Sequence, residues 1–241
     1  MHRFYAPVTS FDGETVTLMD SEAHHLRDVL RHAVGDNVSV FDGQGGEFLC
    51  VIESMTKKNA TLHIVKSVKP AAPESPLDLT VAAAMLKGEK FDLVVKKCVE
   101  LGVTRLVPLV TARCDVRLKD SEKKQERWQK MAIDAARQCG RATLMHVARP
   151  EEFRLFASAG AGVDEVRTLF SERGGESLAG QCLVKKITAF VGPEGGWDDT
   201  ELEIARERQI TIVTFGGRIL RAETAVIAVA TILQHRFGDI N

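Results

Sequence analysis

Residues 210–230 constrain the fold of this chain more than any other stretch, because a strand pattern and a helix pattern meet there across a charged loop. β-Branched and apolar residues run from Ile210 to Phe215 and stop at Gly216-Gly217. A segment with two arginines and a glutamate follows, and an apolar helical pattern resumes at Ala225. The pattern predicts a strand, a glycine-hinged loop and a helix. Charges in a short connection between two buried elements are costly unless something binds there, so this loop is the first candidate site.

Strand and helix patterns alternate through residues 77–241. Strands are predicted at residues 77–85, 104–110, 144–148, 166–170, 187–191 and 210–215. Helices are predicted at residues 89–101, 121–139 and 199–207, and the last of them carries a capping box at Thr200-Glu201-Leu202-Glu203. Strands separated by helices imply a mostly parallel sheet covered on both faces, so these residues are predicted to form an α/β domain.

Residues 1–70 show a different pattern, in which short strands are separated by turns. Strands are predicted at residues 15–19, 37–41, 48–55 and 61–68, with one helix at residues 21–31 behind a Ser21 cap. Such a small β-rich unit suggests a barrel. Three prolines then fall within the segment PAAPESP, so residues 71–76 are predicted to be a linker between two domains.

Charge and cysteine content narrow the range of functions. The chain has 32 basic and 33 acidic residues, so it is not expected to hold nucleic acid by bulk charge, and any basic footprint must be local. The segment MHRFYAPVTS lacks the apolar core of a signal peptide, and no apolar run approaches the roughly 18 residues of a membrane helix, so we expect a cytoplasmic protein. The five cysteines include no Cys-x-x-Cys pair, which favours reduced structural thiols over disulfides or a metal site.

Glycine-rich connections follow three of the predicted strands, at residues 171–175, 192–196 and 216–221. The carboxyl ends of parallel strands share the edge of a sheet where ligands bind, and glycine lets backbone amides closely approach a nucleoside-sized molecule. The alternative is that each glycine pair only makes a turn. The chain lacks the Gly-x-Gly-x-x-Gly, P-loop and Gly-x-Ser-x-Gly sequences, which weakens the dinucleotide-binding, P-loop and serine hydrolase interpretations.

Arg218, Arg221 and Glu223 form the densest polar group in these connections. Paired guanidinium groups can hold a phosphate or stabilise developing negative charge. Alternatively, Glu223 only interacts with the dipole of a helix, worth roughly 0.3 to 1 kcal/mol, and the arginines are solvated. The residues alone leave both interpretations open.

Five segments of the chain occur in an order that is typical of one enzyme family. They are MHRFY with HHLRDVLR at residues 24–31, KGEKFDLVVKKCVELGV at 87–103, ARQCGR at 136–141, GPEGG at 192–196 and RILRAETA at 218–225. With these segments the chain resembles the bacterial 16S ribosomal RNA uridine-N3 methyltransferases of the SPOUT superfamily. The resemblance implies a PUA-like β-barrel in residues 1–70 and a SPOUT-type α/β domain with a C-terminal trefoil knot in residues 77–241. It also implies a homodimer that uses S-adenosylmethionine to methylate 16S ribosomal RNA, in the small ribosomal subunit.

The resemblance further implies which residues hold each ligand. The cofactor-binding residues would be Leu169, Phe170, Ser171, Val191, Gly192, Pro193, Glu194, Gly195, Gly196, Phe215, Gly216, Arg218, Ile219, Leu220, Thr224 and Ala225. The RNA-binding candidates are Arg3, Arg27, Arg31, Arg113 and Arg141. The chain departs from the family at Lys96, where glutamine is common, so no contact is assigned to the Lys96 side chain.

The chemistry of the implied reaction constrains the roles of the charged residues. Methylation of uridine N3 requires removal of its proton and stabilisation of negative charge on the flanking carbonyl oxygens. Our hypothesis is that Glu223 or Glu194 helps to remove the proton and that Arg218 or Arg221 stabilises the uridine anion. The absence of a Pro-Cys dipeptide agrees with methylation at nitrogen, because methylation at carbon 5 typically needs a thiolate. Two alternatives are a non-catalytic RNA-binding or ribosome-assembly factor, and a SPOUT methyltransferase that acts on another RNA, such as a transfer RNA ribose.

Overall fold

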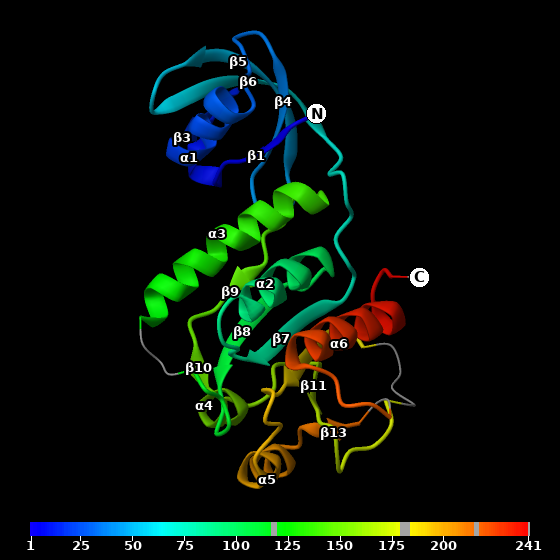
Figure 1. Ribbon diagram of the computed structural model, residues 1–241. Coiled ribbons are helices and arrows are strands. Elements are labelled where there is room, and N and C mark those ends of the chain that lie inside the picture. The colour runs from blue at the N-terminus through cyan, green and yellow to red at the C-terminus, as the bar shows by residue number, and fades with distance from the viewer. Residues whose placement is uncertain (117–119, 179–183, 215–216, 241) are drawn as a thin grey trace. The chain divides into compact units, whose positions relative to one another are not determined.

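The computed structural model in Figure 1 describes residues 1–116, 120–178, 184–214 and 217–240, and the chain forms two units. The N-terminal unit comprises Met1–Glu74 and Ile133–Leu144, and the C-terminal unit comprises Ser75–Ala132 and Met145–Asn241. The last seven residues of the 19-residue helix α3 (Ser121–Cys139) therefore belong to the N-terminal unit. Helical periodicity shows that such a helix has an apolar face, but it does not show which partner that face packs against.

The N-terminal unit is built on a six-stranded sheet in the order β1-β4-β5-β6-β3-β2. Its strands are β1 (Arg3–Tyr5), β2 (Phe11–Asp12), β3 (Thr15–Met19), β4 (Asn37–Phe41), β5 (Glu47–Met55) and β6 (Asn59–Val68), with a 3-10 turn at Val8–Ser10. The β1–β4 pair is parallel and the other pairs are antiparallel. Alternate side chains such as Val16 and Leu18 of β3 point into a common apolar core. The sequence predicted the four longer strands, whereas β1 and β2 are too short to give a periodic signal.

The helix predicted at residues 21–31 is present but changes its winding. It begins as α1 (Asp20–His24) and continues as the π-helical turn η2 (His25–Val29), in which the Leu30 amide donates to the His25 carbonyl oxygen at 2.9 Å. The turn buries Leu26 completely, and the chain leaves it through Arg31, whose φ is +56°. The wider turn accounts for the difference from a regular α-helix.

The C-terminal unit contains a parallel sheet in the order β10-β8-β7-β12-β11-β13, with β9 paired to β8. The strands are β7 (Asp78–Ala84), β8 (Arg105–Val110), β9 (His146–Val147), β10 (Glu151–Glu152), β11 (Glu165–Phe170), β12 (Lys186–Val191) and β13 (Thr211–Val213). The helices are α2 (Lys90–Glu100), α3 (Ser121–Cys139), α4 (Phe153–Ser158), α5 (Asp199–Glu207) and α6 (Ala222–Phe237). The mostly parallel α/β sheet predicted from the sequence is confirmed.

Helices cover the sheet as the alternation of patterns predicts. Helix α2 packs against α6, and α6 also contacts β7 and β12, while α4 contacts α5 (Figure 1). Leu169 and Phe190 lie in one apolar core with Phe153 of α4 and Leu202 of α5. Because successive side chains of a strand point to opposite faces, each of these strands has a second row of buried residues on its other face.

Two local predictions differ from the structure. The N-cap of α5 is Asp198, which forms a capping box with Glu201, so the box predicted to start at Thr200 begins two residues earlier. The Asp198 carboxylate reaches the Thr200 amide at 3.2 Å, and this bond fixes the helix start. Strand β13 ends at Val213, before the predicted end at residue 215, and residues 215–216 lie outside the described part of the chain. Within that part, no helix is both long and apolar enough to span a bilayer.

Candidate functional site

A cavity of about 210 Å³ lies at the carboxyl ends of β11 and β12, against α6. Three connections line it, one after β11, one after β12 and one before α6, which are the connections that the sequence analysis selected. The lining residues are Phe170, Ser171, Glu172, Val191, Gly192, Pro193, Glu194, Gly195, Gly196, Trp197, Arg218, Ile219, Leu220, Ala222, Ala225 and Val229.

Most of the predicted cofactor-binding residues line this cavity, and among the described residues Leu169 and Thr224 do not. Leu169 is fully buried in the core beneath the sheet, and Thr224 is exposed on α6. Phe215 and Gly216 lie outside the described residues. Trp197, Ala222 and Val229 also line the cavity and were not predicted, whereas Glu172 belongs to the glycine-rich connection at residues 171–175. Ala222 and Val229 lie three positions before and four positions after Ala225, so helical spacing from Ala225 points to them.

Trp197 joins two of the connections. Its side chain is 1% exposed, and its indole Nε1 donates a hydrogen bond of 2.8 Å to the carbonyl oxygen of Phe170. The ring also packs against Phe153, at 5.0 Å between centroids. A Cβ atom at Gly192 would lie 3.0 Å from the indole nitrogen, so glycine is required there for this packing. The indole thus sets the distance between the β11 and β12 connections.

Gly196 closes the turn that follows β12. Its amide donates to the carbonyl oxygen of Pro193 at 3.0 Å, and its φ is +68°, a conformation that side chains disfavour. A Cβ atom there would also meet Glu172 Oε1 at 2.8 Å. Backbone groups of this turn therefore face the cavity without side chains in the way, which suits a ligand recognised through amides.

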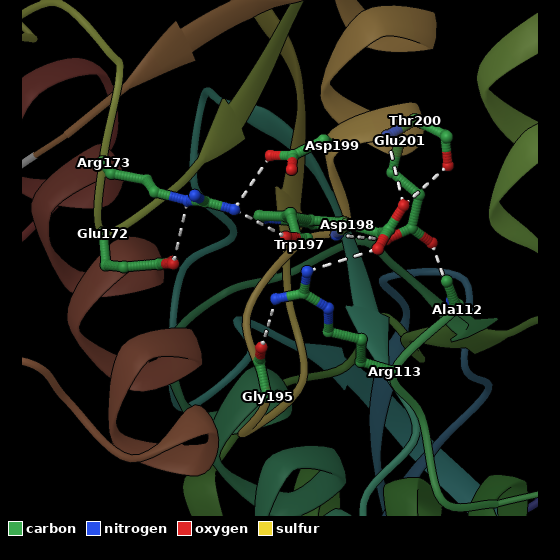
Figure 2. A network of polar contacts seen from close by, with 10 residues as sticks. All are labelled: Ala112, Arg113, Glu172, Arg173, Gly195, Trp197, Asp198, Asp199, Thr200 and Glu201. Atoms are coloured by element: carbon green, nitrogen blue, oxygen red, sulfur yellow. Dashed lines mark hydrogen bonds and ion pairs between the residues drawn. The ribbon is translucent and has the colours of Figure 1, made fainter.

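Two arginines bind this turn and the residues that directly follow it, as Figure 2 shows. Arg113 donates to the Gly195 carbonyl oxygen and to Asp198, both at 3.2 Å. Arg173 binds Asp199 at 3.0 Å. In the same network, the Ala112 amide donates to Glu201 Oε1 at 2.8 Å. These ion pairs are exposed and each contributes little to stability, so their main effect is to orient the turn.

Of the four predicted catalytic residues, Arg218 and Glu194 line the cavity, and Arg221 and Glu223 do not. Arg218 and Glu194 are exposed, and Arg221 is the exposed N-cap residue of α6. Glu223 lies in the first turn of α6, where its Oε2 atom is buried and has no hydrogen-bond partner among the described residues. The structure thus gives different environments to Glu194 and Glu223, which had the same candidate role in the sequence-based hypothesis.

Lys90, the first residue of α2, joins this group. Its Nζ atom lies 2.5 Å from Glu194 Oε1. The hydrogen bond to Glu194 raises the pKa of the Lys90 ammonium, the charges of Glu194 and Glu223 raise it further, and Arg221 opposes them. The ammonium therefore lies within electrostatic range of both carboxylates and of one guanidinium.

The predicted RNA-binding arginines divide into buried and accessible residues. The Arg3 guanidinium binds Glu47 at 2.9 Å and donates to main-chain carbonyl oxygens, and the Arg141 side chain is 4% exposed and binds Glu74 at 2.7 Å. The structure therefore places these two arginines inside the N-terminal unit, where they satisfy buried acceptors, rather than on its surface. Arg31 is exposed and Arg27 is partly exposed beside Asp28. Arg113 contacts the glycine turn at residues 192–196 through the Gly195 carbonyl oxygen.

The arrangement suits a ligand that combines apolar and polar parts. Val191, Ala225 and Val229 supply an apolar wall, the glycine turn supplies backbone groups, and the charged residues stand at the rim. Among the residues that the structure describes, no group of three or more His, Cys, Asp or Glu side chains could hold a metal ion.

Comparisons with known proteins agree with both units. An RNA methyltransferase domain profile matches residues 73–234, and an RNA methyltransferase PUA domain profile matches residues 18–65. The chain is 37% identical to ribosomal RNA small subunit methyltransferase E of Synechocystis, over 90% of this chain and 72% of that protein. It is 31% identical to the protein of the same name from Rickettsia conorii, over 86% of this chain and 84% of that one. A crystal structure of ribosomal RNA small subunit methyltransferase E from Neisseria gonorrhoeae, bound to S-adenosyl methionine, superposes with a TM-score of 0.91 at 33% identity and covers 100% of both chains.

Proposed function

The chain belongs to the RNA methyltransferase family that includes the small subunit methyltransferase E proteins, and we propose that it methylates N3 of a uridine in 16S ribosomal RNA with S-adenosylmethionine. The observation that carries this proposal is the cavity formed by the connections after β11 and β12 and before α6. Its position at the carboxyl edge of a parallel sheet suits a nucleoside-sized cofactor.

The residues present fit S-adenosylmethionine. Gly192 and Gly196 pack closely against Trp197 and Glu172 and carry no side chains, so the backbone of residues 191–196 is available to hydrogen-bond the ligand. Val191, Ala225 and Val229 give an apolar surface for the flat base of a nucleoside. When bound, the cofactor supplies an electrophilic methyl group.

The charged rim supplies the remaining chemistry. Glu223 or Glu194 accepts the N3 proton of the uridine, and such general base catalysis contributes roughly 100- to 10,000-fold in rate. Arg218 or Arg221 stabilises the negative charge that spreads onto the carbonyl oxygens of the base. Loss of one such contact costs roughly 2.7 to 4 kcal/mol in the barrier, as for oxyanion-hole donors.

RNA recognition falls to the N-terminal unit and to the turn beside the cavity. Arg27 and Arg31 are the accessible candidates on the first, and Arg113 is the candidate on the second. Residues 1–70 carry seven Lys and Arg against nine Asp and Glu, a net charge of 7 − 9 = −2. Recognition therefore depends on the shape of folded RNA within the small ribosomal subunit more than on bulk charge. A ribosomal substrate places the protein in the cytoplasm.

We also propose a homodimer with a trefoil knot in the C-terminal segment. Helix α6 is apolar around most of its circumference, and Ile227, Ala228 and Ile232 remain only partly buried. A helix that is apolar on all sides needs a partner on each face, and a second copy of α6 would supply it. Sedimentation of the Ile227→Glu variant tests this point, because a charge at the interface should yield monomers.

Mass spectrometry of nucleosides tests the proposed reaction. The enzyme and S-adenosylmethionine are incubated with small ribosomal subunits, with bare ribosomal RNA and with transfer RNA. We expect 3-methyluridine from ribosomal substrates only. The Arg221→Ala variant should still bind the cofactor but form product roughly 100- to 1,000-fold more slowly. A ribose-methylated nucleoside from transfer RNA would identify a different methyltransferase. A chain that neither binds the cofactor nor forms product would be a non-catalytic RNA-binding factor.

A further inference from the structure

One ion pair at the rim of the cavity connects α2 with the turn after β12. It joins Lys90 Nζ to Glu194 Oε1 at 2.5 Å, and the two side chains are 44% and 43% exposed. Glu194 lines the cavity, whereas Lys90 does not. Lys90 therefore touches the site only through the carboxylate that it holds.

The carboxylates of Glu194 and Glu223 are in different states. Glu194 lines the cavity, whereas Glu223 lies on α6 between the lining residues Ala222 and Ala225 and does not line the cavity itself. The Glu194 carboxylate already accepts a hydrogen bond from an ammonium group. The Oε2 atom of Glu223 accepts none from any described residue and is closed off from water. Buried polar atoms without partners are uncommon in folded proteins and call for an explanation. An acceptor that awaits a donor from the substrate is such an explanation.

A base must have a free lone pair directed at the proton that it removes. Glu223 meets this requirement, whereas proton transfer to Glu194 would first require its ion pair with Lys90 to break. Without Lys90, a second unpaired carboxylate would face the same rim, and like charges disfavour formation of a further anion there. The Lys90 ammonium thus keeps Glu194 from acting as the base and neutralises the charge of its carboxylate.

We propose that Lys90 is a positioning residue that holds the Glu194 carboxylate in an ion pair and so leaves Glu223 as the group that accepts the N3 proton. This inference rests on the proposed function. In the step, the N3–H bond breaks and its proton passes to Glu223. The electron pair left on N3 forms the bond to the methyl carbon, and the methyl–sulfur bond breaks with its electrons kept by sulfur.

The test is a set of variants that remove one or both charges of the Lys90–Glu194 ion pair, or that keep the positive charge on a different side chain. Glu223→Gln should lower kcat roughly 100-fold or more, as expected for loss of a general base, and Glu194→Gln should lower it less. Lys90→Met should lower kcat because it frees the Glu194 charge. The double variant Lys90→Met/Glu194→Gln should recover most of that loss, and Lys90→Arg, which keeps the positive charge, should retain most of the wild-type rate.

Lys186 provides a matched control. It begins β12, the strand that leads to Glu194, its side chain is 43% exposed, and it lies 3.9 Å from Asp78 in an ion pair outside the cavity. Lys186→Met should therefore leave kcat unchanged. Calorimetric titration with S-adenosylmethionine and thermal unfolding give readouts that do not depend on turnover. Both should stay close to wild type in all the Lys90 variants, so that their defect lies in kcat rather than in cofactor affinity or folding.

The outcomes separate the inference from the function on which it rests. Wild-type enzyme that forms no 3-methyluridine overturns the proposed function. If wild type forms it, two results overturn the role of Lys90: a double variant as slow as Lys90→Met, or Glu194→Gln as slow as Glu223→Gln. Loss of cofactor affinity in Lys90→Met would show that the ion pair only supports the binding turn, which also overturns the inference.

Discussion

The indole nitrogen of Trp197 donates a 2.8 Å hydrogen bond to the carbonyl oxygen of Phe170, and this bond joins the connections after β11 and β12. Both residues line the cavity. A single buried side chain therefore sets the separation of two of the three chain segments that would hold the cofactor.

Replacement of Trp197 by phenylalanine should weaken cofactor binding as well as stability. The variant removes the indole donor to the Phe170 carbonyl oxygen, and loss of one such hydrogen bond costs about 0.5 to 1.5 kcal/mol. Trp128→Phe is the control, because Trp128 is also buried and donates to Asp92 at 3.1 Å, outside the cavity. Urea unfolding should show losses in both variants, and calorimetry should show lower affinity for S-adenosylmethionine only in Trp197→Phe. Equal affinities would mean that the bond does not shape the cavity.

Replacement of Gly196 by alanine should disturb the cavity more than the same change at Gly174. The two glycines have φ values of +68° and +69°, so the backbone strain added by alanine is the same, of order 1 kcal/mol. A Cβ atom at Gly196 also meets Glu172 at 2.8 Å, whereas at Gly174 the nearest atom is 4.0 Å away. We expect similar unfolding midpoints for the two variants, but a lower cofactor affinity for Gly196→Ala alone.

Arginines of the N-terminal unit should divide into two classes on replacement by alanine. Arg27→Ala and Arg31→Ala should reduce RNA affinity and the slope of its salt dependence while leaving stability unchanged. Arg141→Ala should instead destabilise the fold by roughly 3 to 5 kcal/mol, because it removes a buried partner of Glu74. Filter binding at several salt concentrations, combined with urea unfolding, distinguishes the two classes. RNA affinity that falls only with stability would contradict the assignment of Arg27 and Arg31.

Lowering the pH should destabilise the fold of the N-terminal unit, because Glu47 then becomes protonated. Burial alone would raise the pKa of this carboxyl group, but hydrogen bonds from Arg3 and Ser39 and the Arg3 charge outweigh it and lower the pKa below 4.5. The unfolded chain therefore binds this proton more tightly than the folded chain. The stabilising contribution is complete above the unfolded pKa and is lost as pH falls through the folded pKa.

Glu47→Gln should expose this dependence on pH. At neutral pH the variant should lose roughly 3 kcal/mol in the free energy of unfolding, because a buried ion pair is broken. The difference from wild type should be constant above the unfolded pKa and should shrink as the pH falls through the lower, folded pKa, since the wild-type carboxyl group then becomes neutral too. Urea unfolding at a series of pH values measures both quantities. A difference that stays constant over the whole pH series would mean that the carboxylate is not the titrating group.

Long periodic elements of the fold were predictable from the sequence. The helix over residues 121–139 and the strand over residues 37–41 were predicted with the bounds that the structure shows, because each has a clear period. Strand β10 and helix α4 were not predicted, since they have only two and six residues, which are too few to show a periodic pattern. The trefoil knot stays a prediction.

The location of the candidate site was predictable from glycine-rich connections at one sheet edge, but the roles of individual side chains were not. A sequence shows that Glu194 and Glu223 are both carboxylates near such connections. It does not show that Lys90, more than 100 residues earlier in the chain, binds one and not the other. Arg3 and Arg141 likewise look like surface charges until the acceptors that they satisfy inside the N-terminal unit are known.

All the described residues that line the cavity come after residue 169. Because the ribosome makes a chain from its N-terminus, strands β7 and β8 emerge from the exit tunnel long before α6 can close the cavity. A nascent chain is therefore unable to enclose a cofactor during most of its synthesis. Catalytic competence is therefore acquired only after α6 has emerged, later than either of these strands.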